Sequence, residues 1–221
     1  MASEGIEMLL DFGGSGGYHG GWDSNPCGMT DNASEPTLDA PQTIEIGTSA
    51  AVCLGGLMPA APVQVRATRP DGLEVKDVLE TNKWGGATWS WVRLPGALTG
   101  TYLLEARQGT VVVVGQFVVT PASKPHIVVK DDIVADKSDL TVGLAGLPSF
   151  TPVPMVLYRH RSQGGAEFVA IVGDMTPDAT GEALERFALP AGIGPGGYRL
   201  YAGPPKNKQG EGLWIDFSVV P

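Results

Sequence analysis

Gly100–Ala106 reads GTYLLEA and Gly196–Ala202 reads GGYRLYA, so one pattern of glycine, tyrosine and alternating apolar residues occurs twice in the chain. Each block follows a Leu-Pro pair and precedes a Phe-x-Val sequence. These flanking elements are Leu94-Pro95 and Phe117-Val118-Val119 in the first copy, and Leu189-Pro190 and Phe217-Ser218-Val219 in the second. Each copy closes on a proline, Pro121 or Pro221, and the two lie about one hundred residues apart. An internal repeat of this length indicates two copies of one domain.

Outward from these blocks, short apolar segments alternate with turn residues at intervals near ten residues, which is typical of a β-sandwich. The first copy is predicted to contain the strands Thr43–Ile46, Ala50–Leu54, Val63–Thr68, Leu73–Leu79, Thr88–Leu94, Thr101–Arg107 and Val111–Val119. The second is predicted to contain His126–Val129, Leu140–Ala145, Val153–Arg161, Phe168–Val172, Ala183–Leu189, Tyr198–Ala202 and Leu213–Val220. The one helical signal is a single turn at Thr180–Arg186, because Gly181 and Pro190 oppose a longer helix.

The repeated blocks, with the turn Thr176–Glu182 entering a strand, resemble bacterial extracellular immunoglobulin-like or fibronectin-III-like domains. The resemblance covers roughly residues 41–221. It implies an all-β fold of two tandem immunoglobulin-like antiparallel β-sandwiches, one over 41–121 and one over 122–221. The linker between them is short, so a nearly collinear arrangement is expected. The resemblance concerns the fold and implies little about function.

Tyr102 and Tyr198 each follow a glycine where the chain turns into the penultimate strand. A tyrosine in this position can bury its ring while its hydroxyl bonds to nearby backbone, as in the tyrosine corner of sandwich domains. The sequence therefore predicts one such corner in each domain.

The composition limits the classes of partner. The chain has 221 residues, 43% of them hydrophobic, and a net charge of −9, with no cluster of Lys or Arg that overrides the average. An acidic protein repels phosphate backbones, so no nucleic-acid partner is expected. No stretch approaches the roughly 20 apolar residues of a transmembrane helix, so no membrane span is expected.

Cys27 and Cys53 are the two cysteines of the chain. An even count in a Gly-rich, Lys-poor β protein favours a disulfide between them, the alternative being two free thiols. A disulfide favours a secreted or cell-surface location. Met1-Ala2-Ser3-Glu4 lacks the features of a signal peptide, so the chain is either cytoplasmic or has lost a leader, and the cysteines and the fold favour the second alternative.

Residues 1–40 form a Gly-rich N-terminal segment that reads as a loop or tether without its own core. Within it, Ile6–Phe12 is a short apolar run whose alternate residues Ile6, Met8, Leu10 and Phe12 could form a donated strand at the edge of a sheet. Deletion of residues 1–17 would then abolish self-assembly.

No constellation of catalytic residues is recognisable, so the chain is predicted not to be an enzyme. The histidines His19, His126 and His160 lie far apart in the sequence, and no metal-binding or nucleophile motif occurs. No cofactor is expected. Calcium is the one candidate ion, because Asp131, Asp132, Asp136 and Asp139 crowd one turn, although a solvated turn explains them better.

Candidate binding residues are aromatic. Tyr18, His19 and Trp22 lie in the Gly-rich segment, and Trp84 lies in the loop Asn82–Gly86. Trp89 and Trp91 share one face of a strand, where they form either a sugar-stacking platform or, as we favour, the sandwich core. Trp214, in the last strand, is also expected in the core.

These features favour a non-catalytic extracellular or cell-surface protein with a structural or adhesive role. Two alternatives stay open. One is a self-assembling fibre or surface-layer subunit that uses N-terminal strand addition. The other is an accessory module of a larger secreted enzyme that binds carbohydrate or protein. The expected partner is accordingly a protein, a glycan or a second copy of the chain.

Overall fold

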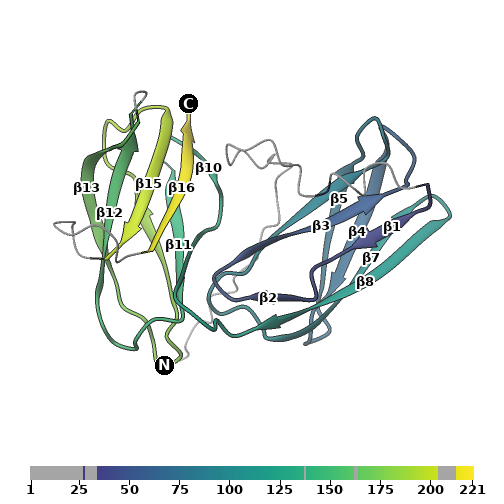
Figure 1. The fold of residues 1–221 in the computed structure, drawn as a ribbon, viewed down its shortest axis with the longest axis horizontal. Coiled ribbons are helices and arrows are strands. Elements are labelled where there is room, and N and C mark those ends of the chain that lie inside the picture. Colours follow the sequence, from purple (N-terminus) through teal and green to yellow (C-terminus); the bar gives the residue numbers. More distant parts are fainter. Residues whose placement is uncertain (1–26, 28–33, 137, 162–163, 204–212) are drawn as a thin grey trace, which may run out of the picture.

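The computed structural model describes residue 27 and the ranges 34–136, 138–161, 164–203 and 213–221. These residues form sixteen strands and no helix (Figure 1). The strands assemble into four sheets, two from residues 37–120 and two from residues 126–220. The chain is therefore an all-β protein of two sandwiches in tandem.

The first sandwich packs a three-stranded sheet, in the order β1-β3-β6, against a five-stranded sheet, in the order β2-β8-β7-β4-β5. Its strands are β1 (Thr37–Asp39), β2 (Thr43–Glu45), β3 (Ser49–Gly55), β4 (Pro62–Thr68), β5 (Glu74–Glu80), β6 (Ala87–Val92), β7 (Gly100–Gln108) and β8 (Val111–Thr120). Neighbours are antiparallel except β2 and β8, which pair in parallel.

The second sandwich repeats this topology strand for strand. Its strands are β9 (His126–Val129), β10 (Ile133–Ala135), β11 (Asp139–Ala145), β12 (Val153–His160), β13 (Ala166–Met175), β14 (Ala183–Ala188), β15 (Gly196–Ala202) and β16 (Leu213–Val220). The sheet orders are β14-β11-β9 and β10-β16-β15-β12-β13, and β10 pairs with β16 in parallel as β2 does with β8. The internal repeat read from the sequence is thus a repeat of topology.

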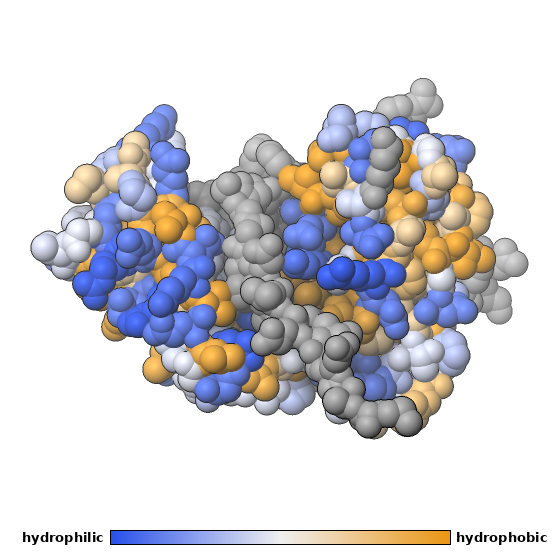
Figure 2. Space-filling model, turned by 180° about the vertical axis from the view of Figure 1, so that it is seen from behind, coloured by the Kyte–Doolittle hydropathy of each residue, from blue (hydrophilic) through white to orange (hydrophobic). Residues whose placement is uncertain are grey.

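Buried and exposed side chains alternate along the strands, and this alternation shows where the cores lie. In β4, Val63, Val65 and Ala67 are buried, whereas the residues between them face solvent or are half-buried, as the period of two along a strand requires. Each sandwich then encloses one hydrophobic cluster. On the face shown in Figure 2, hydrophobic and hydrophilic residues intermingle over both sandwiches.

Both predicted tyrosine corners are confirmed. The Tyr102 hydroxyl donates to the Leu98 carbonyl over 3.0 Å, and the Tyr198 hydroxyl donates to the Gly194 carbonyl over 2.7 Å. Both rings are buried and stack on a phenylalanine of the last strand, Tyr102 on Phe117 and Tyr198 on Phe217. The conserved pattern of the repeat therefore marks the same structural corner in each copy.

Two short strands, β1 and β10, were not predicted from the sequence. β1 and β10 are three residues long, too short for an alternating pattern, and β1 lies in the stretch that was read as a tether. It pairs with β3 from Thr37 opposite Gly55 to Asp39 opposite Cys53. The predicted strand Ala183–Leu189 is confirmed as β14, which pairs with β11, and the single helical turn predicted at 180–186 does not form.

The carboxylate of Glu45 makes several contacts across the junction between the sandwiches. Glu45, at the end of β2, accepts hydrogen bonds from the Ser123 backbone N–H (3.0 Å) and the Ser123 hydroxyl (2.7 Å). Its other neighbour is His126 Nε2 at 3.1 Å. The hydrogen bonds from Ser123 make the largest contribution, and His126 a smaller one, to lowering the pKa of Glu45 to about 2. We call Glu45, Ser123 and His126 the junction clamp.

Close backbone contacts complete the junction. A Cβ on Gly47 would lie 2.8 Å from His126 Cβ and 2.9 Å from Ala145 Cβ, and its φ of +85° also favours glycine.

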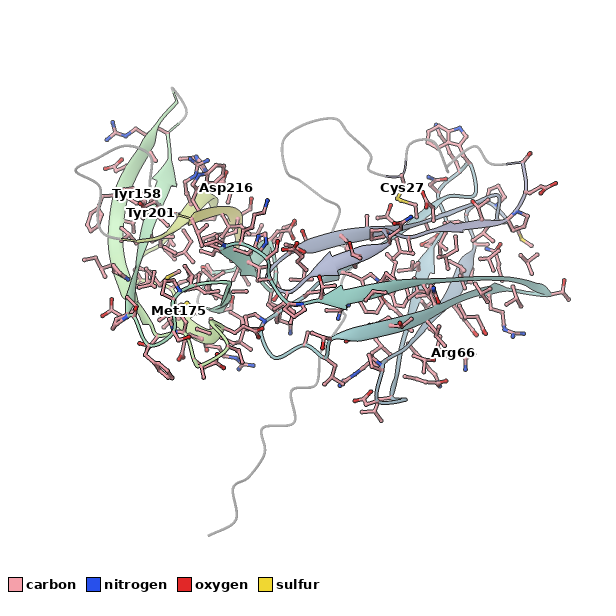
Figure 3. The ribbon with its side chains drawn as sticks, turned by 60° about the horizontal axis from the view of Figure 1, so that its bottom comes forward. Cys27, Arg66, Tyr158, Met175, Tyr201 and Asp216 are labelled. Carbon is pink, nitrogen blue, oxygen red and sulfur yellow. A yellow bond between two sulfur atoms is a disulfide. The ribbon has the colours of Figure 1, made fainter. Side chains whose placement is uncertain are left out.

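A second polar contact across the junction joins the Gly96 N–H to the Glu182 carboxylate at 2.9 Å. The strands of the two sandwiches run at a steep angle to each other in Figures 1 and 3. The expected nearly collinear arrangement is therefore wrong.

Acid should weaken the junction through Glu45. A carboxylate whose pKa falls from 4.5 to about 2 on folding contributes stability that is complete above pH 4.5 and is lost as the pH falls through about 2. We expect Glu45→Gln to lower the melting temperature at pH 7, and the difference from the wild type to shrink between pH 4.5 and 2. Calorimetry of both proteins across this pH range measures the difference in melting temperature. A pH-independent difference would contradict the assignment.

Candidate functional site

Several predicted site residues lie outside the described part of the chain. These are Ile6, Met8, Leu10 and Phe12 of the strand-donor hypothesis, and Tyr18, His19 and Trp22 of the candidate loop. Their roles stay predictions. The two cysteines are described, and a disulfide joins Cys27 to Cys53 in β3 (Figure 3). It attaches residue 27, which is itself buried, to the first sandwich.

The tryptophans separate into core and surface. Trp89 and Trp91 are 2% and 0% exposed, so they belong to the core and cannot stack on a sugar. The buried Arg93 guanidinium lies 4.2 Å from the Trp91 ring centroid. Burial lowers the pKa of Arg93 to about 10, so it remains a cation at neutral pH. Trp84 is 55% exposed, and the Lys83 ammonium lies 4.3 Å from its ring centroid.

The aspartates of the calcium hypothesis do not converge. Among the described residues, no group of three or more His, Cys, Asp or Glu side chains is arranged to hold a metal ion. The backbone carbonyl of Asp132 accepts from the Ser218 N–H, and the backbone N–H of Asp136 donates to Val220. This segment therefore pairs with β16, and its observed bonds are those of a sheet edge.

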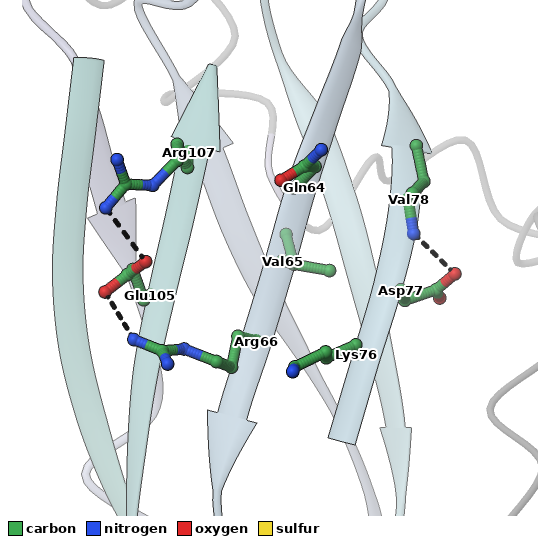
Figure 4. A pocket seen from close by; sticks show the side chains of 8 residues that line it. All are labelled: Gln64, Val65, Arg66, Lys76, Asp77, Val78, Glu105 and Arg107. Atoms are coloured by element: carbon green, nitrogen blue, oxygen red, sulfur yellow. Dashed lines mark hydrogen bonds and ion pairs between the residues drawn. The ribbon is translucent and has the colours of Figure 1, made fainter. Parts of the chain in front are cut away.

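Part of the outer face of the five-stranded sheet in the first sandwich is a shallow charged depression (Figure 4), and the exposed Leu103 and Val114 lie on the same face. Arg66 bridges Glu74 at 2.7 Å and Glu105 at 2.8 Å, and Arg107 adds a longer contact to Glu105. Glu74 also pairs with Lys76. The charges of this face thus compensate one another across β5, β4 and β7.

The corresponding outer face of the second sandwich is aromatic. Across β13, β12, β15 and β16, the strand register makes neighbours of Phe168, Tyr158, Arg199 and Asp216. Phe168 and Trp214 are 56% and 53% exposed, and Ile171 is 57% exposed. We call the group of Tyr158, Phe168, Ile171, Arg199, Trp214 and Asp216 the aromatic face.

Two β-bulges build this face. The register of β13 against β12 shifts twice. Between the pairs Tyr158–Phe168 and Leu157–Ala170, β13 has one extra residue. It has a second extra residue between the pairs Val156–Ile171 and Met155–Gly173. Val169 and Val172 are the extra residues, and both pack against the core. In a regular strand, residues 168 and 171 would point to opposite faces. The bulge at Val169 instead turns both large apolar side chains outward, which is a known use of bulges at binding sites.

A polar network lies beside the rings. Arg199 donates from Nε and Nη2 to the two carboxylate oxygens of Asp216, at 2.7 and 2.9 Å. His160 Nε2 lies 3.1 Å from the same carboxylate. The Arg199 guanidinium also lies 3.9 Å from the Trp214 ring centroid. Burial raises the pKa of Asp216, but the bonds and charges of Arg199 and His160 outweigh it and leave this pKa below its usual range.

The aromatic face was not predicted from the sequence. Trp214 was expected in the core, and this was wrong. Leu213, Ile215, Phe217 and Val219 occupy the inward positions of β16, so Trp214 and Asp216 fall on the outside. That alternation was readable in the sequence. Gly173 marks the second bulge, but the bulge at Val169 was not readable, because no glycine or proline lies beside it.

No family model matches the chain, and no curated protein matches it. Among solved structures, Salmonella alpha-2-macroglobulin aligns over 85% of this chain and 15% of its own, with 13% identity and a TM-score of 0.35. Trypsin-activated alpha-2-macroglobulin from Escherichia coli aligns over 86% and 16%, with 12% identity and a TM-score of 0.35. A tetra-tandem repeat from the extending region of a large adhesion protein aligns over 80% and 47%, with 14% identity and a TM-score of 0.27.

This chain thus spans less than half the length of each of these three structures. The class that its own fold defines is an all-β protein of tandem sandwiches. Within the described residues, no helix is long and apolar enough to cross a membrane.

Proposed function

We propose that this chain is a non-catalytic extracellular or cell-surface protein, structural or adhesive in role, that contacts a partner through the aromatic face. The observation that carries the proposal is the exposure of Phe168, Ile171 and Trp214 on one face of a rigid sheet. Large apolar groups held in water cost solvation free energy, and grouped exposed ones mark interaction surfaces.

Two further observations support the extracellular and non-catalytic parts of the proposal. The Cys27–Cys53 disulfide is typical of oxidising compartments. The two described histidines are each engaged with a carboxylate, His126 in the junction clamp and His160 beside Asp216.

The location can be tested on intact source cells with a membrane-impermeant amine-reactive biotin reagent. We expect the chain to be labelled without lysis, or to appear in the medium. Both cysteines should resist alkylation until a reductant is added, as mass spectrometry would show. Labelling that requires lysis, together with two thiols reactive without reduction, would refute the proposal.

A further inference from the structure

We propose that the ligand of the aromatic face is an uncharged polysaccharide, a proposal that rests on the proposed function and specifies the chemistry of the partner. The groups that would contact it are Phe168, Tyr158 and Trp214 through their rings, and Arg199 and Asp216 through hydrogen bonds. All five stand on four adjacent strands of one sheet.

The shape of the face suits a linear chain of sugar rings. Adjacent strands lie about 4.8 Å apart, so the row from Phe168 to Asp216 is roughly 14 Å long. Pyranose rings have apolar C–H faces, which lose their contact with water when they stack on an aromatic ring. Tyr158 and Phe168 meet edge to face at 6.1 Å between centroids, and this packing restricts both rings before any ligand arrives.

The charges of the face favour a neutral ligand. Arg199 is paired with Asp216, and Arg161 lies 3.5 Å from Glu167 on the neighbouring strand. With a net charge of −9 on the chain, an anionic polymer would be repelled. Of the five N–H donors of the Arg199 guanidinium, the bonds to Asp216 use one on Nε and one on Nη2, which leaves three. The paired groups can therefore bond to hydroxyls without giving up their mutual contact.

The edge of this sheet is poorly suited to pairing with a second copy of the chain. β13 is the edge strand, and its two bulges interrupt the regular ladder that an added strand would need. Association of two copies through the aromatic face is the competing arrangement, and the experiment below separates it from sugar binding.

Native affinity electrophoresis in gels that contain a neutral polysaccharide provides the test. The panel holds a β-glucan, a xylan, a galactomannan and, as the anionic member, polygalacturonate. Wild-type chain is expected to be retarded by at least one neutral polymer and not by polygalacturonate. Trp214→Ala should weaken this binding about tenfold or more, equivalent to about 1.4 kcal/mol.

The matched control is Leu103→Ala. Leu103 is 54% exposed on β7, so it is an equally exposed apolar side chain, but it belongs to the first sandwich. Its replacement should leave the affinity for the polymer unchanged. Circular dichroism of both variants checks that they are folded. If Trp214→Ala unfolds, Phe168→Ala on β13 provides a second variant that is expected to lose binding.

Three results would overturn the proposal. The first is no retardation by any neutral polymer, the second is retardation by polygalacturonate alone, and the third is an equal loss of affinity in Leu103→Ala. Sedimentation that shows a dimer lost in Trp214→Ala, without polymer binding, would assign the face to a second copy. In each case, surface labelling of intact cells would still decide the extracellular location independently of the ligand.

Discussion

Replacement of Trp91 by alanine should lower the free energy of unfolding of the first sandwich by about 4 kcal/mol, within the 3–5 kcal/mol usual for a buried aromatic residue. Trp91 is fully buried and meets Trp89 and Phe117 edge to face at 4.6 and 5.2 Å between centroids. Its removal leaves a cavity and also deprives the buried Arg93 cation of the nearest of its three aromatic rings.

Urea unfolding followed by near-ultraviolet circular dichroism would measure the loss. The control is Trp84→Ala, since this exposed side chain should change the free energy by less than about 0.5 kcal/mol. Equal effects of the two substitutions would show that Trp91 does not organise the core.

Breaking the Cys27–Cys53 disulfide should destabilise the same sandwich by about 3.5 kcal/mol. The bridge closes a loop with a sequence separation of 26 residues, and the chain-entropy relation gives about this value for such a loop. The physical cause is the larger conformational freedom of the unfolded chain once the link is cut. Paired Cys27→Ser and Cys53→Ser substitutions avoid an unpaired thiol.

Denaturant unfolding of the oxidised wild type, the reduced wild type and the paired variant would measure this effect. The second sandwich has no cysteine and serves as an internal control, because its transition should stay in place. A shift of both transitions by the same amount would mean that the sandwiches unfold as one unit through the junction clamp.

The fold was largely readable from the sequence because its signals are local. The alternation in Val63–Ala67 and the paired blocks around Tyr102 and Tyr198 each report on a strand or corner a few residues long. The short strands β1 and β10 were not readable, because their identity depends on partners in β3 and β16 rather than on a pattern of their own.

The aromatic face was harder to predict because it is assembled from distant segments. Phe168 and Trp214 come together only when β13 and β16 take their places in the sheet. The alternation of apolar and other residues along β16 could have placed Trp214 on the outer face. The direction of Ile171 could not be predicted, since it depends on a bulge that arises from the fit of β13 to the core.

The disulfide also determines how the molecule would bear tension along its chain. In the second sandwich, a pull between the two ends of the domain would act on the parallel pair β10–β16, shearing its hydrogen bonds together rather than opening them one at a time. The first sandwich has the same pair in β2–β8. A force that arrives ahead of Cys27, however, passes through the sulfur bridge directly into Cys53, and so bypasses β1 and β2. Two domains of one topology would therefore resist stretching by different routes.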